Sequence, residues 1–202
     1  DSILEPLISR LESAHGRRPK SYPAPIARKS AVPKFDDQAP TLTDIGQALS
    51  LLRKKHKICL VRAPLNWPAA AYEFQEPLDY LGYDGGGGVG SGPGMTIGAA
   101  IALQGTGRAV VGIMGDGEFL GSASALWTAA HYRIPALIVV ANNRSYFTDE
   151  IQQAMVARER NRPVENRWIG QRIDDPPINL AGLARDYGVE AEGPVAKASD
   201  IL

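Results

Sequence analysis

Polar residues that suit a hard metal ion follow two apolar runs of this chain. Residues 109–114 end at Gly115-Asp116-Gly117, and residues 135–141 end at Asn142-Asn143. If both runs are parallel strands, their carboxyl ends share one edge, where open α/β folds bind ligands. The Asp116 carboxylate and the Asn143 amide oxygen, with a loop carbonyl, suit Mg²⁺ or Ca²⁺ rather than zinc. Mg²⁺ usually completes its coordination with water and phosphate oxygens, so we expect a phosphate-bearing ligand.

The residues around Asp116 also suit a bulky anion. Gly115 and Gly117 would let the backbone pass close to it, and a helix starting near Glu118 would point free N–H groups at it. The alternative is an ordinary βαβ unit, in which Asp116 caps a helix and the Asn pair makes a turn. The spacing alone leaves both interpretations open.

A longer pattern resembles a known fingerprint. Gly-Asp-Gly, then 24 residues from Glu118 to Ala141, then Asn-Asn, is similar to the cofactor motif of thiamine-diphosphate enzymes. Residues 125–135, ALWTAAHYRIP, resemble the branch that includes benzoylformate decarboxylase and acetolactate synthase. The resemblance covers about residues 40–202. It implies thiamine diphosphate and Mg²⁺ as cofactors, and decarboxylation or carboligation of a 2-oxo acid as the reaction.

The resemblance also implies roles for individual residues. The metal ligands would be Asp116, Asn143 and the Ser145 carbonyl, and the Tyr146 N–H would meet a phosphate oxygen. The Glu118 side chain departs from the pattern, because a second carboxylate near a diphosphate is repulsive unless it turns away or is paired. We therefore expect only its backbone N–H to contribute. The implied cofactor-binding set is Gly87, Val89, Gly115, Asp116, Gly117, Glu118, Asn143, Ser145 and Tyr146.

The glycine-rich stretch from Asp84 to Gly94 allows close approach of backbone to a ligand. By resemblance, the Gly87 carbonyl and the Val89 amide would hold the aminopyrimidine, with the Val89 side chain wedged under the bent cofactor. Val89 as a plain apolar loop residue is the alternative. Gly85-x-Gly87-x-x-Gly90 also matches a dinucleotide fingerprint. That reading needs a strand directly before the loop, and it leaves Asn142-Asn143 without a role.

Alternating apolar runs and helical spacing predict an α/β fold, an open and mostly parallel sheet with helices on both faces. Strands are expected at 58–62, 109–114 and 135–141, and another begins at 189–191. Helices are expected at 1–14, after Thr41 or Thr43, near 69–74, after Pro93, at 121–132, at 149–158, after Asn179 and from Ala198. Since the last of these is cut short, the C-terminus is expected to be truncated.

Residues 1–39 are interpreted as the end of a preceding domain and a proline-rich linker, and residues 40–202 as the cofactor domain. In the resembled family, the glutamate that activates the cofactor comes from another domain, usually of a neighbouring subunit. No catalytic residue is therefore expected in this chain. The expected partner is a pyrimidine-binding domain of the same or a neighbouring subunit, in a homodimer or homotetramer. The alternative is a non-catalytic fragment or subunit that binds cofactor or a partner.

The composition indicates which partners and which cellular location to expect. Basic and acidic residues balance at 22 each, which gives no reason to expect nucleic acid or an anionic membrane as partner. The single cysteine, Cys59, lies in an apolar run and is interpreted as a buried thiol. The sequence has no membrane-length apolar stretch and no signal-peptide pattern, so a cytoplasmic protein is expected.

Overall fold

The computed structural model of the chain describes residues 4–14, 33–68, 70–82 and 88–202. The chain forms two compact units, Asp1–Val32 and Pro33–Leu202. In the first, α1 (Leu4–Ala14) is the amphipathic helix that the apolar spacing predicts. The predicted linker lies outside the described residues up to residue 32. Residues 36–38 belong to the second unit, where the Asp36 and Gln38 carbonyls accept the N–H groups of Ser199 and Ala198, each at 2.9 Å.

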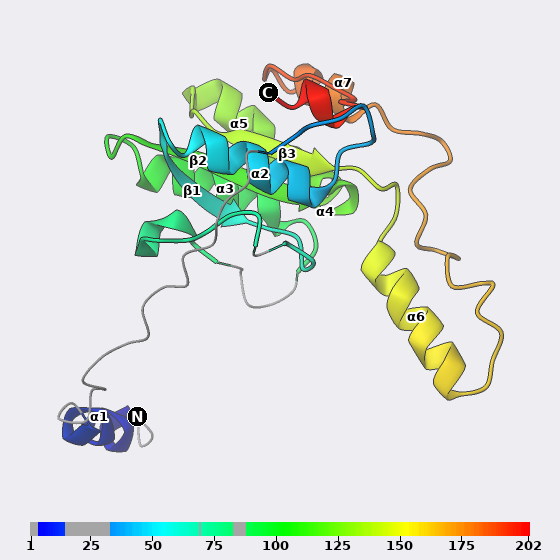
Figure 1. Cartoon of the computed structure of the whole chain (residues 1–202), viewed down its shortest axis with the longest axis horizontal. Coiled ribbons are helices and arrows are strands. Elements are labelled where there is room, and N and C mark those ends of the chain that lie inside the picture. The colour runs from blue at the N-terminus through cyan, green and yellow to red at the C-terminus, as the bar shows by residue number, and fades with distance from the viewer. Residues whose placement is uncertain (1–3, 15–32, 69, 83–87) are drawn as a thin grey trace. The chain divides into compact units, whose positions relative to one another are not determined.

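Three parallel strands form the sheet of the second unit, in the order β1-β2-β3 (Figure 1). They are β1 (Lys57–Arg62), β2 (Arg108–Gly115) and β3 (Leu137–Ala141), and all three predicted runs are confirmed. The pairing of β2 with β3 ends at Gly115 opposite Ala141. Asp116 and Asn142 therefore leave the sheet side by side at one edge, as the polar residues after each run predict.

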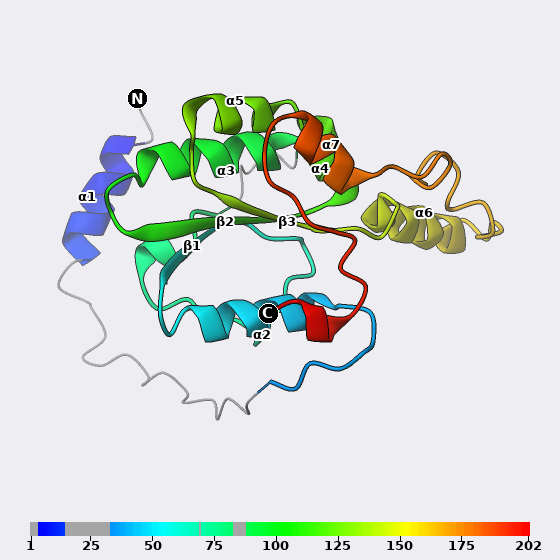
Figure 2. The ribbon, with the colours of Figure 1, turned by 90° about the horizontal axis from the view of Figure 1, so that it is seen from above.

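Helices cover both faces of the sheet (Figure 2). One face carries α2 (Leu42–Leu52), whose N-terminus is closed by a capping box between Thr41 and Asp44. The other carries α3 (Ser91–Ala102) and α5 (Ala125–Tyr132). The doubly covered α/β fold is confirmed, and it explains why the strands read as continuous apolar runs.

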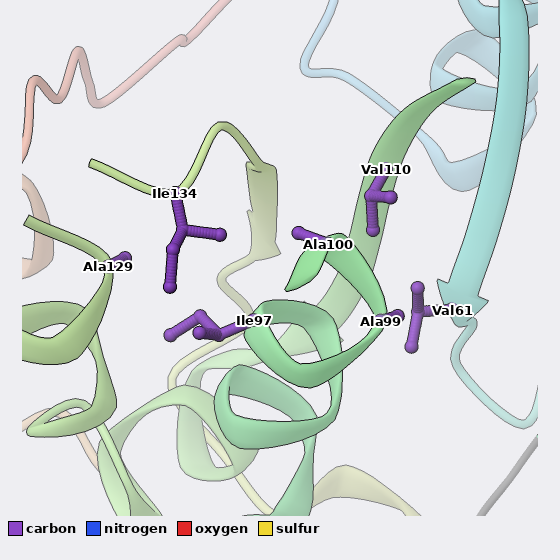
Figure 3. Packing of buried hydrophobic residues seen from close by; sticks show 7 residues of the cluster. All are labelled: Val61, Ile97, Ala99, Ala100, Val110, Ala129 and Ile134. Atoms are coloured by element: carbon purple, nitrogen blue, oxygen red, sulfur yellow. The ribbon is translucent and has the colours of Figure 1, made fainter. Parts of the chain in front are cut away.

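Apolar clusters lie on both sides of the strands, because successive side chains of a strand point to opposite faces. Figure 3 shows the core under α3 and α5, where Val61 and Val110 of the sheet meet Ile97, Ala99, Ala100, Ala129 and Ile134. Small side chains on α3 let it pack closely on the sheet. The core under α2 contains Leu49, Ile58, Leu60, Tyr72, Val111 and Ile113.

The helix predicted at 121–132 is divided, and that prediction is wrong in its N-terminal part. It consists of α4 (Asp116–Gly121), a turn at 122–124, and α5. The break coincides with a contact from the glycine-rich loop, since a Cβ on Gly121 would lie 2.7 Å from the Gly90 Cα. The Ser122 hydroxyl also donates a hydrogen bond to the Gly90 carbonyl.

Four further elements are present among the described residues. They are η2 (Pro77–Asp79), α6 (Phe147–Glu159), α7 (Leu180–Asp186) and the 3₁₀ turn η3 (Ala198–Asp200). Asn179 caps α7 as predicted, accepting the Gly182 N–H at 2.8 Å. Two expectations are wrong: the described residues of 69–74 form turns instead of a helix, and residues 189–191 form no strand. Val189 instead packs its side chain against the core under α3 and α5 and against a third apolar cluster, which contains Met114, Phe119 and Leu126.

Candidate functional site

Asp116 lies at the carboxyl end of β2, where the chain turns into α4, and it is 3% exposed. Its Oδ1 accepts the Gly117 N–H at 2.8 Å. Its Oδ2 is buried and has no hydrogen-bond partner among the described residues. Burial raises the pKa of this carboxyl, and nearby backbone N–H groups, led by that of Gly117, offset part of the rise. The structure thus holds a buried carboxylate oxygen that no described residue pairs as a cation or hydrogen-bond donor.

The Asn142-Asn143 pair makes the turn that follows β3. The Asn142 Oδ1 accepts the Arg144 N–H and the Asn143 Oδ1 accepts the Ser145 N–H, each at 3.1 Å. The same two N–H groups act on the Asp116 carboxyl and lower its pKa, which places this loop beside Asp116. Asn143 is exposed and Ser145 is 6% exposed. The turn interpretation of the Asn pair and its position near Asp116 are therefore both correct.

These residues fit a magnesium ion. The unpartnered Oδ2 of Asp116 is a hard, anionic ligand next to a loop rich in carbonyl and amide oxygens. Among the described residues, no group of three or more His, Cys, Asp or Glu side chains gathers to hold a metal ion. One carboxylate with neutral oxygens, water and phosphate is a common set for Mg²⁺, whereas zinc sites draw on His and Cys.

The glycines of the Gly-Asp-Gly sequence have different surroundings. A Cβ on Gly117 would lie 2.2 Å from the ring of Tyr146, so this glycine is required by the packing of that ring. A Cβ on Gly115 would meet nothing within 4 Å. The Tyr146 N–H donates to the Gln171 carbonyl at 2.9 Å. The predicted phosphate contact of that N–H would require this hydrogen bond to open.

Glu118 is buried and paired, which is one of the two arrangements that the sequence leads us to expect for a carboxylate at this position. Its Oε2 lies 3.0 Å from the Arg62 Nη2, at the end of β1. Its Oε1 accepts the Gly92 N–H at 2.6 Å, and the hydroxyl of Ser91 lies 3.4 Å away. The carboxylate therefore neutralises Arg62 and caps α3, so its charge is balanced by these contacts.

The glycine-rich loop is described only from Gly88 onward, so Gly87 lies outside the described residues. Val89 is 60% exposed and directly precedes Gly90, which has a φ of 103° and enters α3. The contacts of Gly90 with Gly121 bring Val89 to the same edge as α4. Of the described residues before the loop, Tyr80 forms only an isolated bridge to Leu60, so no strand leads into it as a dinucleotide fingerprint needs.

The sequence did not predict two ion pairs at this edge, in each of which the carboxylate is buried. Arg62 pairs with Glu118, and Arg172 pairs with Glu150, which is 1% exposed. The only signal for the first is a cation that ends an otherwise apolar strand. Nothing in the spacing around Glu150 distinguishes it from the solvated polar residues of α6.

Comparisons with known proteins agree with this geometry. A family model described as "Thiamine pyrophosphate enzyme, C-terminal TPP binding domain" matches residues 64–201. Benzoylformate decarboxylase of Pseudomonas aeruginosa is 34% identical over 119 residues, which cover 59% of this chain and 20% of that protein. A probable acetolactate synthase large subunit of Methanocaldococcus jannaschii is 27% identical over 175 residues, covering 82% of this chain and 28% of that protein.

A solved structure shares the fold. The thiamine diphosphate-dependent 4-hydroxybenzoylformate decarboxylase of Rhodococcus jostii RHA1 superposes with a TM-score of 0.67 at 24% identity, over 90% of this chain and 32% of that one. The chain thus spans a fifth to a third of the length of these relatives. In the part of the chain that the structure describes, no helix is long and apolar enough to cross a membrane. The chain belongs to the thiamine pyrophosphate enzymes, and its residues 64–201 match their C-terminal TPP-binding domain.

Proposed function

We propose that this chain is the diphosphate- and Mg²⁺-binding part of an enzyme that decarboxylates or ligates a 2-oxo acid. The observation that carries the metal assignment is the buried Asp116 Oδ2, which lies beside the Asn143–Ser145 loop and has no hydrogen-bond partner in the part of the chain that the structure describes. The relatives named benzoylformate decarboxylase and acetolactate synthase support the reaction class. Several 2-oxo acids fit this description, and the relatives favour no single one of them.

Each residue of the edge has a distinct task under this proposal. Asp116, the Asn143 side chain and the Ser145 carbonyl would hold Mg²⁺. The N–H groups of Gly117 and Glu118, at the start of α4, would face the phosphates. Arg62 keeps the Glu118 carboxylate occupied at 3.0 Å, so that its charge does not oppose the diphosphate.

The cofactor, once bound, would supply the carbon nucleophile and the electron sink, while the protein places and tunes it. The exposed Val89 side chain would form an apolar wall against its pyrimidine half. The acid that activates the pyrimidine would come from another domain, in a homodimer or homotetramer. An acid supplied by another domain is consistent with a chain that spans a fifth to a third of the length of its relatives.

Titration calorimetry on the intact protein tests the metal assignment. Wild type should bind thiamine diphosphate in a Mg²⁺-dependent way, and Asp116→Ala should abolish that binding, because no other carboxylate is proposed to neutralise the metal. Asp174→Ala, at an exposed carboxylate of the loop before α7, is the matched control. An Asp116→Ala protein with wild-type affinity would contradict the assignment.

A second candidate is a non-catalytic fragment or subunit that binds cofactor or a partner without turnover. It is a candidate because this chain covers only 20% of the Pseudomonas aeruginosa relative and 32% of the Rhodococcus jostii structure. A mass measurement on the native protein separates the two. A chain near the length of the relatives, or a co-purifying partner with the pyrimidine-binding domain, supports the enzyme. A solitary short chain without turnover supports the fragment.

A further inference from the structure

Glu150 is a buried charge on a helix that extends away from the sheet. Its side chain is 1% exposed, whereas its neighbours Asp149 and Ile151 are exposed. Figures 1 and 2 show α6 running outward beyond the carboxyl end of β3. The sheet therefore does not bury Glu150. Its burial comes from the loop before α6 and from the segment after it.

The contacts of Glu150 join those two segments. Its Oε1 accepts a hydrogen bond from the Ser145 hydroxyl and lies 3.0 Å from the Arg172 Nε. Its Oε2 lies 3.9 Å from the Arg167 Nε. Removing a carboxylate from water is unfavourable unless cations and hydrogen-bond donors replace the water. The burial of Glu150 thus depends on Ser145 and the two arginines staying in place.

Backbone hydrogen bonds reinforce the same connection. Ser145 and Arg172 form an antiparallel bridge, in which the Tyr146 N–H donates to Gln171 at 2.9 Å and the Ile173 N–H donates to the Arg144 carbonyl at 2.8 Å. Arg144 has a φ of 57°, a left-handed conformation that is uncommon for a residue other than glycine. Such a conformation persists when surrounding contacts hold it, and the bridge supplies those contacts.

We propose that Glu150 is a positioning residue for the metal-binding loop. This inference rests on the proposed function, in which Asn143 and the Ser145 carbonyl hold Mg²⁺. Through the Ser145 hydroxyl Glu150 orients that residue, and through Arg172 and Arg167 it holds the segment 167–173 against the loop. Metal binding and closure of this segment are therefore coupled, and by linkage each strengthens the other.

The first test measures how much Mg²⁺ the intact protein needs to bind thiamine diphosphate. Glu150→Gln keeps the shape of the side chain but removes its charge, and Ser145→Ala removes the hydroxyl while leaving the carbonyl and the ion pair with Arg172. Each should raise the Mg²⁺ concentration for half-maximal binding on the order of tenfold, as is typical when partners of metal ligands are changed. Glu159→Gln, an exposed glutamate on the same helix, should leave it unchanged.

The second test follows the segment itself by limited trypsin cleavage at Arg160 and Arg167, which are both exposed and not followed by proline. In wild type, Mg²⁺ with thiamine diphosphate should slow cleavage, because the closed segment is held against the loop. In Glu150→Gln the cleavage should be faster and respond less to the ligands. Thermal unfolding of the variants without ligand verifies that they fold, and Ser145→Ala keeps the test open if Glu150→Gln does not fold.

The outcomes separate the two proposals. If wild type binds no thiamine diphosphate with Mg²⁺, the proposed function fails. If wild type binds it, but Glu150→Gln and Ser145→Ala keep the wild-type Mg²⁺ requirement and protection from trypsin, only the role of Glu150 is overturned. A raised Mg²⁺ requirement together with lost protection, in variants that unfold at wild-type temperatures, supports the positioning role.

Discussion

Replacing Asp116 by Asn should stabilise the metal-free protein in a pH-dependent way. The introduced amide would keep an oxygen for the Gly117 N–H, now 2.8 Å from Oδ1, but would remove the charge from the unpartnered Oδ2. A buried acceptor without a partner costs about 1–3 kcal/mol. Wild type should therefore carry a penalty of about that size that appears only when Asp116 is ionised, whereas any penalty of the variant does not change with pH.

The sign follows from the pKa of Asp116, which burial raises above its ordinary value. A carboxyl with a raised folded-state pKa contributes stability that is fully present below the unfolded pKa and is lost as the pH rises through the folded pKa. Wild type should lose about 1–3 kcal/mol across that window. The amide side chain of the variant does not titrate, so the cost of its own unpaired N–H group is the same at every pH.

Urea denaturation of the chelator-treated protein, followed by tryptophan fluorescence from pH 4 to pH 8, measures the effect. The free energy of unfolding of Asp116→Asn minus that of wild type should increase with pH. All other titrating groups are common to both proteins and cancel. Asp174→Asn, at an exposed carboxylate, should give a flat difference. A flat or falling difference for Asp116→Asn would refute the argument that this carboxylate is buried without compensation.

Other predictions concern residues at the carboxyl ends of the strands and the activity of the isolated chain. Shortening Val89 to Ala in the intact enzyme should lower turnover more than cofactor affinity, which steady-state kinetics and calorimetry compare; unaffected turnover would mean that another residue is the wedge. Gly117→Ala should lower the thermal midpoint, because its Cβ would lie 2.2 Å from the ring of Tyr146, and Gly115→Ala, with open space, should lower it less. Arg62→Met should destabilise the protein by about 3–5 kcal/mol in urea denaturation, since it strands the buried Glu118; a smaller loss in the double variant with Glu118→Leu is the expected control. The isolated 202-residue chain should release no CO₂ from pyruvate or benzoylformate, and robust release by a preparation of verified mass would show that the catalytic acid lies within it.

Local chemistry made much of the fold predictable. The three strands were readable because each is an apolar run closed by glycine or polar residues, and burial on both faces makes such runs continuous. The caps at Thr41 and Asn179 were readable because they act within four residues of sequence. The strand ends also predicted that Asp116 and the Asn pair share an edge, since the carboxyl ends of parallel strands coincide.

Sequence patterns gave wrong secondary-structure predictions where contacts with a distant segment determine the backbone conformation. Residues 121–132 have helical spacing throughout. The helix is nevertheless interrupted after Gly121, where the backbone of Gly90 lies in close contact. Val189–Ala191 has the residue types of a strand, but its apolar side chains pack on the cores and no neighbouring strand pairs with its backbone among the described residues. Propensity is a weak guide where tertiary contacts of this kind compete with it.

The sequence by itself determined the strands, the caps and the identity of the residues at the metal edge, because all of these depend on short-range spacing. Only the tertiary structure decided how the charges at that edge are balanced. Arg62 reaches Glu118 across 56 residues, and Glu150 meets Ser145 and Arg172 from opposite directions along the chain. Asp116 and Glu150 each keep a buried carboxylate oxygen with no hydrogen-bond partner among the described residues, but only that of Glu150 has a cation nearby, Arg167 at 3.9 Å. Ion pairing depends on distances between folded segments, and the order of residues in a chain does not contain those distances until the fold brings them together.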